Sequence, residues 1–475
     1  MQTIHSPLRT ALDAAYKQSV EYLERLDERS VAATVDVTTL RERLNKPLLN
    51  ESISPEQVIA ELVKDVEGGL LGSAGGRFFA WVIGGSLPAA LAADWLCSVW
   101  DQNAALYACS PAAAIVEEAA AEWLKDLLHI PSHSSFAFVT GCQMAHVTCL
   151  AAARHALLAK HNWDVEQNGL YGAPPIRILT SQQHHGSLER AVRLLGLGQS
   201  QLECLSSDAK DRLEPSALDR ALKAAPSVPT ILVLQAGDIN IGAFDSFETL
   251  IPLAKQHNAW VHVDGAFGLW AAASPRYEHL LRGAEMADSW ATDGHKWLNV
   301  PFDCGYAFVV DAEAHRSSMS HRAAYLVHDA IARDQIDWNP DWSRRGRGFA
   351  TYAALRQLGR QGVARMIENC CEQAHTLALR IGELPTAELL WEPVINQGLV
   401  RFLDPKPGAT EADHDQRTEA VIAEILNTGE AFFGGTTWRG RRAMRISVCN
   451  WQTSAEHVDR VVNAVASVLR KMNVA

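Results

Sequence analysis

The sequence predicts an α/β fold with a mostly parallel sheet between helices, a helical N-terminal segment and a small α+β C-terminal domain. Three observations lead to this expectation. Helical patterns fill the chain up to about Ile130, short β-rich runs alternate with helical stretches from Phe136 onward, and a long helical stretch follows Phe349. Alternating strands and helices are typical of a parallel sheet covered by helices. The 475 residues suffice for two or three domains of roughly 150 residues each.

The sequence pattern of the N-terminal part predicts four helices. The first is amphipathic, the second has Pro55 in its first turn, and the last two are apolar on most faces. They are expected over residues 8–26, 54–71, 88–100 and 111–128.

The middle of the chain predicts the sheet. Apolar runs with strand character are each followed by a helical pattern, which favours parallel strands with helices on both faces. The pairs are 136–140 with 144–160, 176–179 with 188–195, 230–234 with 247–257, and 260–263 with 277–284, and 305–310 is a further apolar run.

The C-terminal part predicts a small α+β domain after a long helix over 349–384. Its strands are expected near 398–403 and 443–448, and its helices near 412–426 and 455–468. We therefore divide the chain into a helical segment (1–100), a large α/β domain (101–375) and a small domain (376–475).

Composition narrows the function classes. A net charge of −12 disfavours nucleic acid or an anionic membrane as the main partner. The longest nearly uncharged stretch, 78–93, contains Gly84, Gly85 and Pro88 and is shorter than the ~20 apolar residues of a membrane span. No signal peptide is expected, because residues 1–16 lack an apolar core. Nine cysteines without a CxxC pair indicate reduced thiols, so a cytoplasmic protein is expected.

Reactive residues follow two of the apolar runs. Asp264 ends the run 260–263, where a buried carboxylate needs a cationic partner, although a helix N-cap or a structural ion pair would also explain it. Lys296 lies 32 residues further on (296 − 264), about one strand–helix–strand unit, so both residues can end neighbouring strands. Desolvation would lower the pKa of this lysine and suit it to Schiff-base chemistry.

Two turns add binding chemistry. The segment from Thr140 to Gln143 joins a strand to a helix, and a helix start suits a phosphate, although this turn by itself is better explained as a plain β–α connection. His184 and His185 are adjacent, but neighbours on an extended segment point in opposite directions, so we expect a stacking or hydrogen-bonding histidine and no metal. A lysine, a carboxylate, a phosphate site and a flat imidazole together describe a pyridoxal-phosphate (PLP) pocket.

The sequence resembles the group II PLP-dependent amino-acid decarboxylases, relatives of the aromatic-amino-acid and glutamate decarboxylases with the fold-type-I, aspartate-aminotransferase-like architecture. The resemblance extends over nearly the whole chain. It rests on Phe79-Ala80-Trp81, Ser110-Pro111, Gly141 to His146, His185-Gly186-Ser187, Gln235 to Asn240, His262 to Ala266, Asp293 to Trp297, Asp303-Cys304-Gly305, Ser343 to Arg347 and Arg445 to Asn450.

The resemblance implies roles for the cofactor site. Lys296 would hold PLP covalently, Asp264 would pair with its pyridine nitrogen, and Ala266 and His185 would lie on the two ring faces. Cys142 and Gln143 would hold the phosphate, helped by Asp293 and His295. Relatives commonly have serine at the position of Gln143, which implies a reshaped phosphate site.

The resemblance also implies a reaction and a substrate pocket. Tyr325 would return a proton to Cα after loss of CO₂, which favours decarboxylation over oxidative deamination, unless it is only a buried loop aromatic. Arg445 is a candidate for binding the substrate carboxylate, with a structural ion pair as the alternative. Phe79, Trp81 and Tyr107 favour an aromatic or apolar amino acid, although any core contains such residues.

The same pocket is also compatible with other functions. A carbon–carbon lyase or an aminotransferase would share the lysine–aspartate pair, and a non-catalytic homologue would serve as a binding protein. The resemblance further implies a homodimer, in which N-terminal helices clasp the partner and the active sites are shared.

Overall fold

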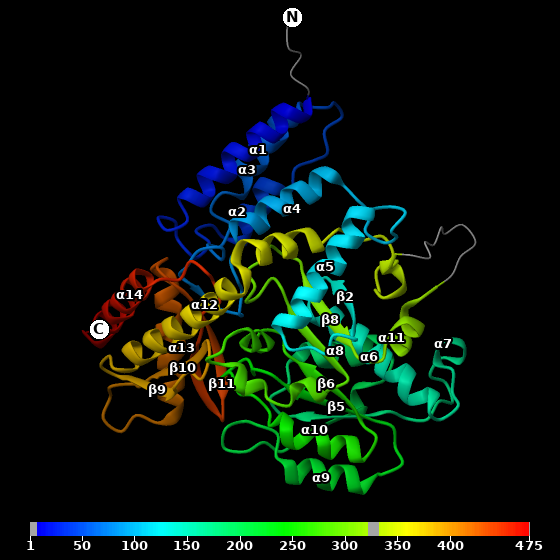
Figure 1. Ribbon diagram of the computed structural model, residues 1–475. Helices are drawn as coiled ribbons and strands as arrows, with labels where there is room; N and C mark the ends of the chain where they lie inside the picture. Colours follow the sequence, from blue (N-terminus) through cyan, green and yellow to red (C-terminus); the bar gives the residue numbers. More distant parts are fainter. Residues whose placement is uncertain (1–6, 322–331, 475) are drawn as a thin grey trace, which may run out of the picture.

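A seven-stranded sheet forms the centre of the computed structural model, which describes residues 7–321 and 332–474 (Figure 1). Its strand order is β2-β8-β7-β6-β5-β3-β4, and only β8 runs antiparallel to its neighbours. The strands are β2 (Ser135–Val139), β3 (Arg177–Ser181), β4 (Leu202–Leu205), β5 (Thr230–Gln235), β6 (Trp260–Asp264), β7 (Ser289–Asp293) and β8 (Gly305–Val309). The predicted fold class is confirmed.

Helices cover both faces of this sheet. Alternate residues of β5 belong to different core clusters, with Ile231 and Val233 on one side and Leu232 and Leu234 on the other. The helices around the sheet are α5 (Pro111–Leu127), α6 (Cys142–Ala159), α7 (Val165–Asn168), α8 (Gly186–Leu194), α9 (Pro215–Ala224), α10 (Phe247–Gln256) and α11 (Ala312–Met319).

A second, five-stranded sheet has the order β1-β11-β12-β10-β9. Its first strand comes from the N-terminal part of the chain and pairs in parallel with β11. The strands are β1 (Phe78–Phe79), β9 (Ala387–Trp391), β10 (Gln397–Phe402), β11 (Phe432–Trp438) and β12 (Arg441–Ser447), and the helices beside them are α13 (Glu411–Asn427) and α14 (Ala455–Val474). The proposed boundaries between domains stay predictions.

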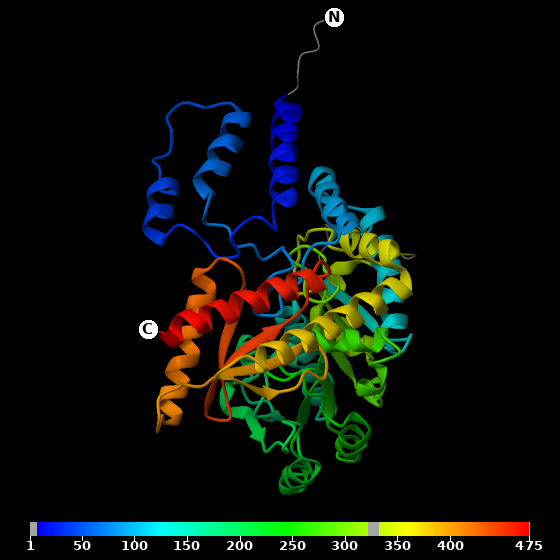
Figure 2. The same ribbon diagram turned by 90° about the vertical axis from the view of Figure 1, so that its left-hand side faces the viewer.

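The N-terminal helices stand apart from the two sheets (Figure 2). They are α1 (Pro7–Glu24), α2 (Val37–Leu44) and α3 (Pro55–Val66), and they lead to α4 (Pro88–Trp100). The long helix α12 (Gly348–Gly382) packs on α4 and α5 and is kinked at Gly359, whose φ of 58° favours glycine.

One predicted helix is wrong. Residues 277–284 form no α-helix, because the stretch between β6 and β7 consists of short 3₁₀ turns: η2 (Gly268–Ala273), η3 (Glu278–Leu281) and η4 (Ala284–Met286). The remaining 3₁₀ turns are η1 (Gln199–Gln201) and η5 (Gln335–Asp337). Strand β7 was missed because Ser-Trp-Ala-Thr-Asp contains no apolar run, yet all five of its residues are buried.

No helix in the described ranges is both long enough and apolar enough to cross a bilayer.

Candidate active site

The candidate site lies at the carboxyl ends of β6 and β7, which are adjacent and parallel. Asp264 is the last residue of β6, Asp293 is the last residue of β7, and Lys296 follows three residues later. The Lys296 ammonium lies 3.1 Å from a carboxylate oxygen of Asp293. The expectation that Asp264 and Lys296 follow neighbouring strands is therefore correct, although 3₁₀ turns rather than an α-helix connect these strands. Ligands of open α/β sheets bind at this edge.

Asp264 is buried and held by three groups. Its Oδ1 accepts hydrogen bonds from the Ala266 amide at 3.2 Å and from the Cys142 thiol at 3.8 Å. Its Oδ2 lies 3.4 Å from Nε2 of His146. Burial alone would raise the pKa of Asp264, but His146, His185 and Lys296 outweigh it and hold the pKa well below its ordinary value. Asp264 is thus an ionised carboxylate in a largely dry site.

The environment of Lys296 differs from the expectation. Burial lowers its pKa as predicted, but the neighbouring Asp293 carboxylate, the Cys142 thiol and Asp264 outweigh this effect and raise the pKa above its ordinary value. The prediction of a lowered pKa is wrong for this arrangement because it omitted Asp293. Only 20% of the lysine side chain is exposed, so its amine is confined to the pocket.

The turn between β2 and α6 packs tightly against the same edge. Asp293 Oδ1 accepts a hydrogen bond from the Cys142 amide at 2.5 Å. A Cβ at Gly305 would lie 2.5 Å from Cα of Gly141, so the two backbones touch and leave no room for a side chain. The N-cap residue of α6, Gly141, has no side chain to cap the helix, and apart from the Cys142 amide held by Asp293 the helix N-terminus is suited to an anion. The Cys142 thiol points toward Asp264 and His146, away from a phosphate-binding role.

The two adjacent histidines behave differently. His185 caps α8, and its Nδ1 accepts a hydrogen bond from the Ser187 amide at 3.2 Å. Burial, together with Lys296, His146 and Arg445, lowers its pKa despite the opposing effect of Asp264, which favours the neutral form of the ring. His184 instead pairs with Glu189 at 3.0 Å. The two rings therefore have different partners, as expected for neighbours that point in opposite directions.

His295 closes the site on the side of the β2–α6 turn. Its Nδ1 accepts a hydrogen bond from the Cys304 amide at 3.1 Å, and its ring stacks on Phe302 at 4.4 Å. Its Nε2 lies 3.6 Å from Asp293. Burial lowers the pKa of His295 although Asp293 opposes it, so its ring is biased toward the neutral form. His295 and Asp293 together fix the turn that begins α6.

The residues predicted to bind or act on the substrate differ in their exposure to solvent. Trp81 is 51% exposed, whereas Phe79 has no exposed surface and stacks on Phe433 at 5.2 Å. We therefore correct the expectation that Phe79 contacts the substrate, because its ring is part of the core behind the pocket. Tyr107 is half-buried, and its amide donates to Asp334 at 2.9 Å. Tyr325 lies outside the described residues.

Arg445 is a buried arginine on β12 that approaches the site from the second sheet. No hydrogen-bond partner is present for its Nε in the part of the chain that the structure describes. Burial lowers the pKa of its guanidinium to about 10 although Asp238 opposes this. A Cβ at Gly434 would lie 3.8 Å from Nη2 of Arg445 and 3.9 Å from Cβ of Ala80, so the segment around Trp81 passes beside this arginine.

Three residues near Asp264 were not predicted. His262, His146 and Ser289 are fully buried, with 2.9 Å from His146 Nδ1 to His262 Nε2 and 2.9 Å from His262 Nδ1 to Ser289 Oγ. Two sequence signals were present. His262 is two residues before Asp264 on the same strand and hence on the same face, and His146 is one helical turn after Cys142.

Cys142, His146 and Asp264 bring three potential metal ligands within 4.8 Å of one another, the only such set found in the described ranges. The edge of the sheet that holds this cluster also carries the groups that an organic cofactor needs. The Lys296 amine, the ionised Asp264 carboxylate and the start of α6 meet at one sheet edge, and both Lys296 and Asp264 act electrostatically on the His185 ring. These groups match the aldehyde, ring nitrogen, phosphate and ring face of PLP.

Known proteins support this assignment. A family described as "Pyridoxal-dependent decarboxylase conserved domain" matches residues 39–403. Aromatic-L-amino-acid decarboxylase from Bacillus atrophaeus is 23% identical over 96% of this chain and 94% of its own length, and 4-hydroxyphenylacetaldehyde synthase from Rhodiola rosea is 25% identical over 93% and 90%. The crystal structure of Oryza sativa TDC with PLP and tryptamine superimposes with a TM-score of 0.92 at 23% identity, covering 99% of both chains.

Proposed function

The chain belongs to the pyridoxal-dependent decarboxylase family and is a PLP-dependent amino-acid decarboxylase, and we propose that its substrate is an L-amino acid with an aromatic or apolar side chain. The observation that carries the substrate proposal is the half-exposed Trp81, which lies on a segment whose Ala80 approaches Gly434 and Arg445 and which then passes the cofactor lysine. A Cβ at Gly84 would lie 2.0 Å from the carbonyl oxygen of Lys296, so this segment touches the lysine backbone.

The residues of the site take separate tasks in this proposal. PLP supplies an electron-withdrawing ring that accepts the electrons of the broken bond at Cα. Lys296 would hold the cofactor covalently through its side-chain amine. Asp264 keeps a proton on the ring nitrogen because it is ionised and buried. Ala266 and His185 confine the ring from its two faces.

The phosphate group is assigned to the start of α6. The backbone amide of Gln143 and the positive end of the helix macrodipole favour an anion there, whereas the Cys142 amide already donates to Asp293. Asp293 cannot bind a phosphate directly, since both are negative. We assign it to fixing the Cys142 amide and the Lys296 amine, and His295 to supporting the same turn.

Arg445 orients the carboxylate of the substrate in this proposal. It is a buried cation whose Nε has no hydrogen-bond partner within the described ranges, and its charge contributes to the lowered pKa of His185, which supports a position near the ring. Holding the bond to the carboxylate perpendicular to the ring aligns it with the electron-accepting system. The substrate side chain would then extend toward Trp81, with Tyr107 assigned to the same pocket.

Tyr325 is assigned the return of a proton to Cα, which completes the amine product. Its position in a decarboxylase-like segment supports this role. One relative bears the name of an aldehyde synthase, so the product identity separates the two outcomes.

A substrate panel tests the proposed function. Purified protein with PLP is expected to release CO₂ and the matching amine from L-tryptophan, L-tyrosine, L-phenylalanine or L-leucine faster than from L-glutamate or L-aspartate. The physical reason is that Trp81 offers an apolar surface and no countercharge. Amine, aldehyde and CO₂ are measured by mass spectrometry. An aldehyde product, or transfer of the amino group to an added keto acid, contradicts decarboxylation, and a preference for acidic substrates contradicts the pocket assignment.

Arg445→Met is expected to raise KM for the preferred amino acid about tenfold or more, with a smaller fall in kcat. A charge-assisted hydrogen bond to a buried carboxylate is worth about 1.5–3 kcal/mol, which is lost when the guanidinium is removed. Steady-state amine release measures both constants.

Arg401→Met is the matched control. Arg401 is also a buried arginine of the second sheet, but it pairs with Glu411 at 2.8 Å. The Arg401→Met variant should have a lower free energy of unfolding and an unchanged KM for the amino acid. An unchanged KM for Arg445→Met would leave only a structural role for this arginine.

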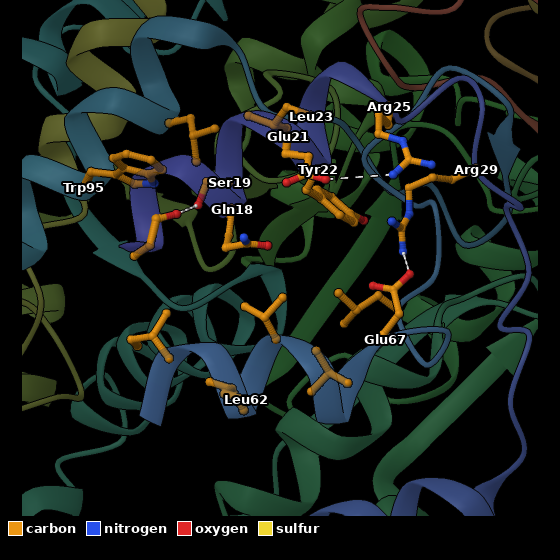
Figure 3. Close-up of a pocket in the computed structure, with 16 residues that line it drawn as sticks. Gln18, Ser19, Glu21, Tyr22, Leu23, Arg25, Arg29, Leu62, Glu67 and Trp95 are labelled. Carbon is orange, nitrogen blue, oxygen red and sulfur yellow. Dashed lines mark hydrogen bonds and ion pairs between the residues drawn. The ribbon is translucent and has the colours of Figure 1, made fainter. Parts of the chain in front are cut away.

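We also propose that the chain forms a homodimer through its N-terminal helices. A groove of about 620 Å³ between α1 and α3 is lined by apolar and aromatic side chains, including Tyr22, Leu62 and Trp95, together with charged side chains such as Arg29 and Glu67 (Figure 3). Further large apolar residues of these helices are exposed, namely Leu8, Leu12, Tyr16 and Val58. An apolar surface of this kind is suited to a second copy of the chain, as the family resemblance implies.

A cytoplasmic location is proposed on the basis of the cysteines. All nine are free thiols, and seven of them are buried. Reduced, unpaired cysteines are typical of proteins from reducing compartments.

A further inference from the structure

A row of buried polar side chains leads from the interior of the sheet to Asp264. It starts at the Trp260 indole, which donates to Ser289 Oγ at 3.0 Å. Ser289 Oγ lies 2.9 Å from His262 Nδ1, and His262 Nε2 lies 2.9 Å from His146 Nδ1. His146 Nε2 then lies 3.4 Å from Asp264 Oδ2. The side chains of this row are screened from water.

The direction of the hydrogen bonds follows from counting donors. Burial, and to a lesser degree His146, lowers the pKa of His262 to about 3, so this ring is neutral and carries a single proton. Ser289 accepts from Trp260 and can donate its own proton to His262 Nδ1. His262 then donates from Nε2 to His146 Nδ1, and His146 donates from Nε2 to Asp264. Every donor named in this row then faces an acceptor.

The opposite direction is unfavourable. It would place a lone pair of His146 Nε2 against an ionised carboxylate oxygen, and two facing acceptors in a dry interior are costly. The Cys142 thiol fits the first arrangement, because burial, Asp264 and Asp293 raise its pKa and keep it protonated as a donor to Asp264 Oδ1.

We propose that Ser289, His262 and His146 form a hydrogen-bond chain that presents an N–H to Asp264 and fixes its carboxylate for pairing with the ring nitrogen of PLP. The inference rests on the proposed function, since it takes Asp264 as the partner of that nitrogen. The three residues are positioning residues, and they act on the cofactor only through Asp264. Because His146 Nε2 bears a proton, the Cys142–His146–Asp264 cluster is a cofactor support and has no free imidazole lone pair for a metal.

Ser289→Ala tests the far end of this chain. The variant removes one hydroxyl that is two side chains away from Asp264, so it leaves the surface of the pocket unchanged. Full-length protein freed of cofactor is titrated with PLP and with a carbocyclic analogue in which C–H replaces the ring nitrogen, and tryptophan fluorescence reports binding. We expect the dissociation constant for PLP to rise about tenfold and that for the analogue to change less than twofold.

Ser135→Ala is the matched control. Ser135 is also a buried strand serine, and its Oγ lies 2.7 Å from Nδ1 of the buried His315, remote from Asp264. This variant loses a similar hydrogen bond but should bind both compounds like the unaltered protein.

A second pair of variants tests His146, the member of the hydrogen-bond chain that contacts Asp264. His146→Gln retains a side-chain N–H donor, whereas His146→Leu does not, so we expect His146→Gln to keep more of the PLP affinity. Equal losses for PLP and the analogue in Ser289→Ala, or no loss for either, would overturn the proposal. Failure of the unaltered protein to bind PLP would instead overturn the cofactor assignment on which the inference rests. Since no substrate is present, the substrate proposal does not affect the result.

Discussion

Lys296→Ala is expected to reduce amine formation at least about a thousandfold and to remove the absorbance band of covalently bound PLP. The buried amine of Lys296 lies at the sheet edge beside Asp293 and Asp264, where it can attach the aldehyde of the cofactor and place its ring. Without that amine, the cofactor binds only through its phosphate and ring contacts and loses the advantage of a fixed orientation. Borohydride reduction followed by peptide mass spectrometry should find the cofactor on Lys296 in the unaltered protein.

Lys125→Ala separates this effect from the loss of a buried lysine. Lys125 is also buried, and its ammonium donates to the carbonyl oxygen of Ser132 at 2.6 Å, away from the site. This variant should keep both the absorbance band and the activity per bound cofactor. If the cofactor of the unaltered protein is attached to another lysine, or if Lys296→Ala retains the band, the assignment of Lys296 is wrong.

The position of the site could be predicted because it depends on strand ends. Asp264 follows a run of apolar residues that forms a fully buried strand, and the distance in sequence to Lys296 is that of one strand-to-strand unit. The same edge of the sheet collects both side chains whatever connects the strands. This is why the error over residues 277–284, which are 3₁₀ turns, did not move the site.

The electrostatics of the site were harder to predict. The pKa of Lys296 depends on the sign of the charges around it, and Asp293 comes close to its amine only because both lie in one turn after β7. Strand β7 itself has a mixed sequence and is buried by its neighbours β6 and β8. Both the raised pKa of Lys296 and the formation of β7 therefore depend on contacts in the folded protein that the local sequence does not show.

The support of Asp264 illustrates a second limit. The residues His262, Ser289 and His146 come from β6, β7 and α6, and nothing local in the sequence relates them. The period of two along β6 places His262 on the face of Asp264, but the partner on α6 follows from packing of the helix on the sheet. Likewise, Phe79 is in the core whereas Trp81 is exposed, a difference that their shared motif does not reveal.

Asp264→Asn is expected to lower kcat at least about a thousandfold even when excess PLP keeps the variant loaded with cofactor. An amide has no negative charge to hold a proton on the ring nitrogen, so the ring accepts electrons from Cα poorly. Because the pKa of Asp264 is held well below its usual range, its carboxylate is ionised throughout the pH range in which the protein is assayed, and acid should not reproduce the defect. The measurement is single-turnover amine release from the reconstituted variant across that pH range.

A cofactor with a permanent charge provides the decisive comparison. N-methylated PLP carries a positive ring nitrogen without help from the protein, so it should restore part of the rate in Asp264→Asn and none in Lys296→Ala. Asp245→Asn is the matched control, since Asp245 is a buried carboxylate that accepts amide hydrogen bonds from Leu213 and Gln235 away from the lysine. Its rate per bound cofactor should not change. An Asp264→Asn variant with nearly normal kcat would show that the ring nitrogen needs no carboxylate, and would remove the electrostatic basis of the assigned mechanism.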